Sequence, residues 1–414
     1  MNNSKTWVSL QLGEVCKLRG GVAFKPALQG RNQGEFPFIK VSDFNLSGNE
    51  VSINGANNWV DAADSSIIQG QTFPAGATVF AKIGEALKHN RKRFLTRPTY
   101  IDNNLMAAVA KLDVMLPEFL FQLFRTIDIA ASDVGTAVPY VKASTLEKIA
   151  VVIPPIEIQR RIASILGAYD DLIEVNRRRI AVLEEMAQGM FEEWFVRFRF
   201  PGHEAAAIED TPDGSLPAGW SWGQFADLAS EIRDTVLPES VDPATPYIGL
   251  EHISRRSTTL AEYGTAADVS SLKARFRRGD ILFGKIRPYF HKVAWAPFGG
   301  VASTDAIIWR PTAALAAQAL LQASNDAFVA YSVQTSNGTK MPRANTKVLA
   351  DYRCALAPSN ISERFENAVG PMIESAASLQ AANLILATAR DLLLPRLISG
   401  QLSVTQAERE LWAA

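Results

Sequence analysis

The sequence contains few residues that could cross-link it, bind a metal or anchor it in a membrane. Only two of the 414 residues are cysteines and four are histidines, and no His-x-x-x-His spacing occurs. These numbers argue against disulfide frameworks and zinc sites and favour a reducing compartment. No apolar run is long enough to span a bilayer, and the first residues lack the pattern of an export signal. We expect a cytoplasmic protein with no cofactor.

Motifs of several enzyme classes are also missing. No acidic residue lies two positions before a lysine, so the end of the common metal-dependent nuclease motif is absent. There is no Gly-x-x-x-x-Gly-Lys-Ser/Thr phosphate loop, and no Asn/Asp-Pro-Pro-aromatic tetrapeptide of the kind that amino-methyltransferases use. We therefore expect a non-catalytic protein. The formal net charge of -1 lacks the excess of cations typical of small nucleic-acid-binding domains, so any such surface must be local.

The chain contains an internal duplication. The segment Phe80–Gly84 is repeated 203 positions later as Phe283–Arg287, and Gly135–Pro139 is repeated at the same offset as Gly338–Pro342. A constant offset without gaps indicates a tandem repeat. Two or three domains are expected for a chain of this length.

Each copy begins with a segment typical of an α+β domain. Short runs of strand-like residues are separated by Gly, Pro and Asn, and a helical apolar pattern that starts at a proline interrupts them. In the first copy, strands are predicted at 36–41, 78–83, 105–109 and 149–153, and a helix at 117–124.

Each copy ends with a pattern typical of a long coiled-coil helix. Apolar residues recur at alternating spacings of four and three after Pro154–Pro155. A helix from Ile156 to Trp194 would be about 58 Å long at 1.5 Å per residue, so it needs an equally long partner. The predicted seam includes Ile162, Leu166, Ile173, Asn176 and Leu183 in the first copy, and Leu379, Asn383 and Leu386 in the second.

The natural partner of each predicted helix is the other one, in antiparallel orientation. If Ile162 lies opposite Leu397, Asn176 lies opposite Asn383. Two facing amides can fix the register of a coiled coil. The alternative, in which each asparagine lies at a solvated edge, remains open at this point.

A segment rich in Gly and Pro separates the copies. The density of helix and strand breakers between Phe198 and Gly219 predicts a linker without regular structure. The predicted boundaries are a first globular domain at 1–154, a helix at 155–199, the linker at 200–216, a second globular domain at 217–357, and a helix with a C-terminal tail at 358–414.

Several motifs resemble those of type I restriction enzyme specificity subunits. Pro154–Ala163, Asn176–Arg178 and Phe191–Phe195 resemble the central conserved region of that family. Ala389–Gly400 resembles its distal conserved region, and Leu216–Trp220 resembles the opening of its second recognition domain. The resemblance covers nearly the whole chain.

The resemblance implies a fold and a division of labour. Two tandem target-recognition domains would be separated by two long antiparallel helices, and each domain would read one half of a bipartite, asymmetric target in double-stranded DNA. The helices would act as a ruler that docks two modification (methyltransferase) subunits, and restriction (endonuclease/translocase) subunits would join afterwards. In one departure from the family pattern, Ser359–Ser362 lacks the Pro-Pro-x-x-x-Gln opening of the first copy, so the start of the second helix stays uncertain.

Basic and polar residues at matched positions are the DNA-binding candidates. Basic clusters can neutralise phosphates, and the loops at 135–142 and 338–345 can present polar groups to bases. A solvated face and a structural turn are the alternative interpretations. The candidates are Lys82, Lys88, Arg91, Lys92, Arg93, Thr136, Tyr140 and Lys142 in the first copy, and Arg275, Arg277, Lys285, Arg287, Lys292, Thr339, Lys340, Arg343 and Asn345 in the second.

Two other classes of function remain open. A coiled-coil adaptor that binds only proteins would explain the helices but not the twin basic clusters. An unrecognised enzyme would reveal itself by methyl transfer from S-adenosylmethionine by the purified chain alone.

Overall fold

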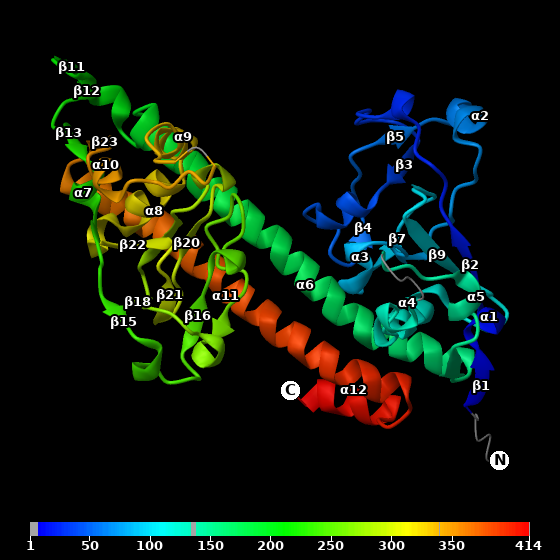
Figure 1. The fold of residues 1–414 in the computed structure, drawn as a ribbon. Coiled ribbons are helices and arrows are strands. Elements are labelled where there is room, and N and C mark those ends of the chain that lie inside the picture. Colours follow the sequence, from blue (N-terminus) through cyan, green and yellow to red (C-terminus); the bar gives the residue numbers. More distant parts are fainter. Residues whose placement is uncertain (1–6, 134–137, 339, 414) are drawn as a thin grey trace. The chain divides into compact units, whose positions relative to one another are not determined.

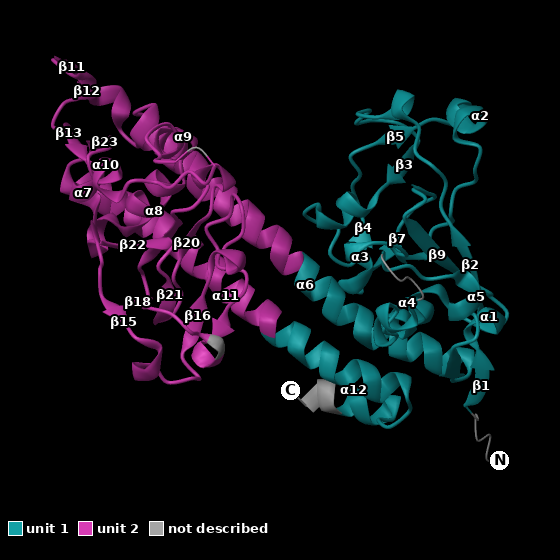
Figure 2. Cartoon of the chain, in the orientation of Figure 1, with its two compact units in different colours: residues 1–174, 385–414 teal, residues 175–384 magenta. Residues whose placement is uncertain are grey.

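A computed structural model describes residues 7–133, 138–338 and 340–413, and it divides into two compact units. Unit 1 consists of residues 1–174 and 385–414, and unit 2 consists of residues 175–384 (Figure 2). The chain therefore enters unit 1, passes through unit 2 and returns to unit 1.

The sheets of unit 1 are built mostly from antiparallel neighbours. The main sheet has five strands in the order β2-β9-β6-β7-β4, and smaller sheets have the orders β5-β3-β8 and β1-β10. Among the named strands, β4 pairs with β7 and β3 pairs with β8 in parallel orientation. The strands are β1 (Val8–Gln11), β2 (Cys16–Gly20), β3 (Phe36–Ile39), β4 (Ser52–Ile53), β5 (Trp59–Val60), β6 (Thr78–Ala81), β7 (Lys92–Leu95), β8 (Tyr100–Ile101), β9 (Leu105–Ala110) and β10 (Ala150–Ile153).

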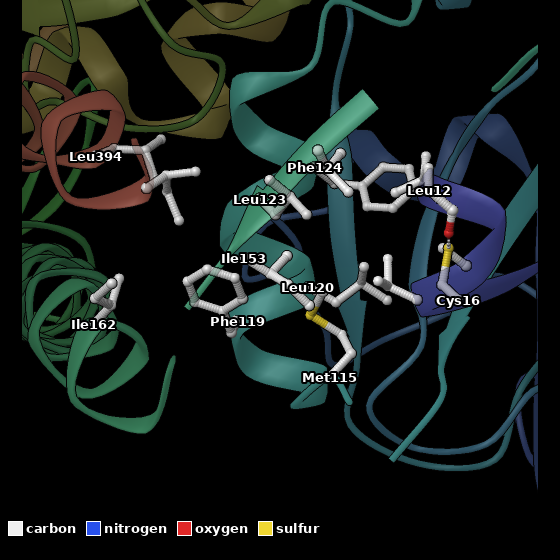
Figure 3. Close-up of a cluster of buried hydrophobic side chains, with 14 of the residues drawn as sticks. Leu12, Cys16, Met115, Phe119, Leu120, Leu123, Phe124, Ile153, Ile162 and Leu394 are labelled. Atoms are coloured by element: carbon white, nitrogen blue, oxygen red, sulfur yellow. Dashed lines mark hydrogen bonds between the residues drawn. The ribbon is translucent and has the colours of Figure 1, made fainter. Parts of the chain in front are cut away.

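Helices cover the main sheet of unit 1 and close its core. Helix α4 (Pro117–Thr126) begins at a proline, as the sequence predicts, and buries Phe119 and Phe124. These rings share one apolar cluster with Leu12, Ile162 and Leu394 (Figure 3). The remaining helices other than the two long ones are α1 (Leu12–Val15), α2 (Ser65–Ile68), α3 (Glu85–Lys88), α5 (Ala143–Leu146) and α12 (Val404–Ala413).

Unit 2 repeats this architecture. Its sheets have the strand orders β14-β22-β19-β20, β15-β18-β21-β16-β17 and β13-β23. The strands are β13 (Ser221–Gln224), β14 (Ala229–Glu231), β15 (Thr235–Val236), β16 (Pro246–Ile248), β17 (Gly264–Thr265), β18 (Lys273–Phe276), β19 (Ile281–Gly284), β20 (Val293–Trp295), β21 (Gly300–Ser303), β22 (Ala306–Pro311) and β23 (Arg353–Leu356). The short helices are α7 (Phe225–Leu228), α8 (Ala316–Ser324), α9 (Asp326–Gln334) and α10 (Thr346–Ala350).

The duplication seen in the sequence is a duplication of structure. Strands β6 and β19 begin 203 positions apart, as do β10 and β23. In the main sheet of unit 1, β6 lies between β9 and β7. In the equivalent sheet of unit 2, β19 lies between β22 and β20. The expected fold, two tandem α+β domains with long helices, is confirmed.

Two helices are far longer than the rest (Figure 1). Helix α6 (Ile156–Phe191) continues into a π-helical turn at Glu192–Val196, and α11 (Ser359–Ile398) starts directly after Pro358. Their starts are also 203 positions apart. The missing Pro-Pro opening therefore does not delay the second helix, because one proline suffices to begin it.

The long helices pack antiparallel in each unit. In unit 1 the start of α6 meets the end of α11, where Ile162 and Leu397 are fully buried in one cluster. In unit 2 the end of α6 meets the start of α11, where the rings of Trp194 and Phe365 lie 5.4 Å apart.

Two asparagines face each other in the helix seam of unit 2. Asn176 donates from Nδ2 to Oδ1 of Asn383 at 2.9 Å, and Asn383 is only 5% exposed. The heptad register predicts this pairing, and the solvated-edge alternative is wrong for Asn383. Of the other seam residues, Ile162, Leu166 and Ile173 are buried. Leu183, Leu379 and Leu386 are half-buried.

Replacing one asparagine of this pair should cost more stability than replacing both. Asn383→Leu leaves the amide of Asn176 without its partner, so we expect a loss of about 1–3 kcal/mol in the free energy of unfolding. The double variant Asn176→Leu/Asn383→Leu removes both polar groups and should recover most of that loss. Urea midpoints at a constant m value would measure both variants. Equal losses in the single and double variants would contradict the pairing.

A buried ionic cluster in unit 1 explains why Arg390, four residues after Leu386 at the next position of the predicted seam, is charged. Asp170 accepts hydrogen bonds from Arg125 at 2.8 Å and from Arg390 at 2.6 Å. The side chains of all three are at most 16% exposed. Asp391, which is 59% exposed, lies at the edge of the cluster 2.8 Å from Arg390. The cluster links α4 to both long helices.

The segment between the copies is more regular than the sequence predicts. Strands β11 (Ile208–Thr211) and β12 (Gly214–Pro217) form an antiparallel hairpin there, so the prediction of a linker without regular elements is wrong. Pro212 and Asp213 form the turn, and Gly214, the first residue of β12, has a φ of 118° that other residues rarely adopt. The turn residues correctly indicate a change of chain direction, but their density hides the two short strands on either side of it.

Candidate nucleic-acid interface

Two of the predicted DNA-binding segments in unit 1 are joined through their backbones. Residues 82–84 follow β6 directly, and residues 139–142 approach α5. The Gly84 amide donates to the Pro139 carbonyl at 2.8 Å, and the Val141 amide donates to the Lys82 carbonyl at 3.0 Å. An isolated bridge pairs Ile83 with Tyr140 between them.

The same contacts recur in unit 2 at the offset of the repeat. The Arg287 amide donates to the Pro342 carbonyl at 2.8 Å, and the Ala344 amide donates to the Lys285 carbonyl at 2.9 Å. A bridge again pairs Ile286 with Arg343. We call residues 82–84 with 139–142, and residues 285–287 with 342–345, the two loop pairs. The sequence does not directly predict the hydrogen bonds within each loop pair. The signal that could have indicated them is that both segments of a pair recur at the same offset of 203 positions.

Each loop pair carries polar side chains that are accessible to a ligand. Lys142, Arg287 and Arg343 are exposed, as is Lys340 beside the second loop pair, whereas Lys82, Tyr140 and Lys285 are half-buried. The Asn345 side-chain oxygen accepts a hydrogen bond from the Lys347 amide at 3.2 Å and caps α10. This oxygen is therefore already used within the protein. Thr136 and Thr339 lie outside the described residues.

Arg287 has an unfavourable backbone conformation. Its φ is 50°, in the left-handed region, whereas the equivalent Gly84 has a φ of 75°. This region costs a residue with a side chain about 1–2 kcal/mol, and glycine almost nothing. Strained residues persist where the surroundings hold them and cluster at functional sites. The guanidinium of Arg287 is therefore a prime candidate for contact with DNA.

Two of the predicted contacts are wrong because the side chains are buried. Lys92 and Arg93 are 6% and 7% exposed. The Lys92 amine donates to the Ile127 carbonyl at 2.7 Å, and burial lowers its pKa to about 8. Arg93 donates to the Lys92 carbonyl at 2.9 Å and to the Phe44 carbonyl at 3.2 Å. Both cations are nearly buried and donate to backbone carbonyls, which argues against either as a phosphate contact.

Three further candidates are engaged within the protein. Lys88 forms an ion pair of 2.8 Å with Glu85 one helical turn earlier. Arg91 donates to an asparagine oxygen at 2.7 Å, and the Lys292 amine donates to the Leu250 carbonyl. Any contact of these residues with DNA would compete with the bonds they already make.

The basic cluster of the second copy divides into two places. Arg275 and Arg277 are exposed and precede β19, whereas Lys285 and Arg287 follow it. Because the strand is extended, the two groups lie at its opposite ends. Arg275 and Arg277 therefore do not belong to the loop pair and remain separate candidates.

The part of the chain that the structure describes contains no candidate metal centre and no helix able to cross a membrane. Within residues 7–133, 138–338 and 340–413, no group of three or more metal-ligating side chains is placed to hold an ion. In the same part of the chain, no helix combines the length and apolar character that crossing a bilayer requires.

Comparisons with known proteins show similarity to one family. Residues 4–185 match the family described as type I restriction modification DNA specificity domain. The chain is 23% identical over 418 residues to the type I restriction enzyme MjaIX specificity subunit of Methanocaldococcus jannaschii, covering 97% of this chain and 95% of that one. It is 24% identical over 325 residues to the EcoDI specificity subunit of Escherichia coli, covering 72% and 66% of the two chains.

A solved structure shows the same fold. The type I restriction-modification S subunit from M. genitalium superposes with a TM-score of 0.56 at 12% identity, covering 96% of this chain and 97% of that one. The two curated relatives and this solved protein are all type I restriction-modification specificity subunits.

Proposed function

We propose that the chain reads a bipartite, asymmetric target in double-stranded DNA with one loop pair for each half-target. It docks two modification subunits and the restriction subunits, acts in the cytoplasm and catalyses no reaction itself. The observation that carries this proposal is the repetition of the loop pair, with equivalent backbone bonds and different side chains.

The side chains of the two loop pairs differ, which supports recognition of a different base sequence by each pair. Tyr140 occupies the position of Arg343, and Lys142 occupies that of Asn345. Arginine and lysine donate to the guanine edge, asparagine pairs with adenine, and cations near the backbone neutralise phosphates. One scaffold with different side chains at equal positions suits a target whose halves differ.

Exchanging residues 1–153 for the matching segment of another specificity subunit should change one half-target only. The second loop pair stays intact, and so do the long helices and residues 385–414 that complete unit 1. Mapping methylated adenines genome-wide, in cells carrying the parent or the exchanged gene, would measure both half-targets. A change in both halves, or an unchanged target, would contradict the proposal.

A further inference from the structure

The loop pair of unit 2 extends into a small ribbon of three backbone segments. Besides its bridge to Ile286, Arg343 forms an isolated antiparallel bridge with Asn337. The Asn337 amide donates to the Arg343 carbonyl at 3.0 Å, and the Arg343 amide donates to the Asn337 carbonyl at 2.9 Å. We call residues 285–287, 337 and 342–344 the ribbon. Arg343 lies on its central segment.

The backbone of Arg343 is fixed from both sides. Its own amide and carbonyl bond to Asn337. The residues before and after Arg343 make the two bonds of the loop pair to residues 285–287, at 2.8 and 2.9 Å. A side chain on a fixed backbone segment has less freedom to lose when it binds a ligand, and such preorganisation favours precise recognition.

Asn337 and Arg343 present their side chains on the same face of the ribbon. Residues directly opposite each other in an antiparallel pair share a face, with Cβ atoms about 4.5–5.5 Å apart. Both side chains are exposed. Within residues 7–133, 138–338 and 340–413, neither side chain makes a hydrogen bond or an ion pair. A guanidinium and an amide that are both accessible to a ligand therefore lie side by side.

The two segments that build the ribbon are basic. Residues 281–290 and 335–346 contain no Asp or Glu, and they carry Lys285, Arg287 and Lys340 besides Arg343. Arg287 and Lys340 are exposed, and Lys285 is half-buried. Cations of this kind bind the phosphate backbone and position a protein on the duplex, which leaves neighbouring side chains to contact the base edges.

We propose that Arg343 and Asn337 read a guanine and an adenine at neighbouring positions of one half-target, in the major groove. This inference rests on the proposed function and adds to it the bases that unit 2 recognises. A guanidinium donates to O6 and N7 of guanine, and an asparagine amide pairs with N6 and N7 of adenine. Successive bases lie about 3.4 Å apart along the helix axis. Two side chains that start about 5 Å apart can match that spacing.

The proposed pair of readers is confined to unit 2. Tyr140 occupies the position of Arg343 in unit 1, and a single hydroxyl cannot donate two parallel hydrogen bonds to guanine. Asn337 is not among the candidates that the sequence suggests, because it precedes the loop at 338–345 and only the bridge places it beside Arg343.

Base analogues that lack N7 test the proposal. 7-Deazaguanine and 7-deazaadenine keep Watson–Crick pairing but have no acceptor at that position. The chain, assembled with its modification subunits, is titrated against target duplexes that carry one analogue at a time, and fluorescence anisotropy gives each dissociation constant. In the half-target that the exchange of residues 1–153 leaves unchanged, we expect one 7-deazaguanine and one neighbouring 7-deazaadenine to weaken binding about tenfold each.

Substitutions assign each contact to its side chain. Arg343→Ala should abolish the penalty for 7-deazaguanine and keep the penalty for 7-deazaadenine, and Asn337→Ala should do the reverse. Lys340→Ala is the matched control, because it removes an exposed cation from the same loop and should keep both penalties. The analogue scan of the other half-target should be the same in all three variants. An unchanged thermal transition would show that each variant folds.

Two results would overturn the proposal. If no analogue in this half-target weakens binding, N7 is not read there. If Arg343→Ala weakens binding to every duplex equally and lowers the salt slope by about one, Arg343 contacts a phosphate instead. Either result leaves target reading intact, provided that the assembled chain prefers its target to an unrelated duplex. Loss of that preference in the parent chain would contradict the proposed function itself, and this inference with it.

Discussion

Asp170→Asn should lower the free energy of unfolding by about 3–5 kcal/mol, because it leaves two buried guanidinium groups without their shared carboxylate. Asp170 is 7% exposed and accepts from both Arg125 and Arg390. An amide can still accept one hydrogen bond, but its own N–H groups would face the cations. Urea unfolding followed by circular dichroism would give the midpoint and the m value.

Asp391→Asn is the matched control for this effect. Asp391 contacts the same two arginines, at 3.6 and 2.8 Å, but its side chain is 59% exposed. Solvent screens such a pair, so the loss should stay below about 1 kcal/mol. Equal losses in the two variants would show that burial does not govern the cluster. Replacing Arg125, Asp170 and Arg390 together by apolar residues should restore stability, because no buried charge then remains.

The double variant Lys285→Ala/Arg287→Ala should bind target duplex about 10–100-fold more weakly at low salt. If both cations contact phosphates, the slope of log affinity against log salt should also fall by about two. Fluorescence anisotropy at several salt concentrations, with the chain assembled with its modification subunits, would measure both quantities. Lys92→Met should leave the affinity unchanged, because that amine is buried. An unchanged affinity in the double variant would remove the loop pair from the interface.

Arg287→Gly separates the role of the side chain from that of the backbone. Glycine relieves the left-handed conformation, so the stability of the variant should equal or exceed that of the parent by up to about 1 kcal/mol. The affinity for DNA should nevertheless fall, because the cation is lost. Gln69→Gly relieves a similar φ of 55° at an exposed, uncharged residue and should change stability alone. A loss of affinity in both variants would mean that backbone strain, and not charge, affects binding.

The long-range framework of this fold is predictable from sequence because it is periodic. The repeat offset and the heptad spacing predict the pairing of Asn176 with Asn383, which lie more than 200 positions apart. The interruption of the seam at Arg390 is visible in the sequence, but its cause is not, because Arg125 and Asp170 come from other elements. The heptad spacing predicts which residues form the seam, but it cannot predict which residues pair with a charged exception such as Arg390.

The candidate site is less predictable because charge patterns do not indicate burial. Lys92 and Arg93 belong to the same basic run as Lys88, yet β7 turns them into the protein. Arg277 and Lys285 are near neighbours in sequence, yet the intervening strand separates them.

The order in which the chain is synthesised conflicts with the order in which its parts can be completed. The core that contains Leu12 and Ile162 also contains Leu397, Leu402 and Ala407. On the ribosome, residues 1–174 of unit 1 therefore cannot complete their core until residues 385–414 have been synthesised. Synthesis of the intervening residues takes roughly 10–50 s at ordinary elongation rates. During that interval its apolar face is exposed to chaperones and proteases. A ribosome that stalls before residue 385 would release a product with an open core, which would be prone to aggregate.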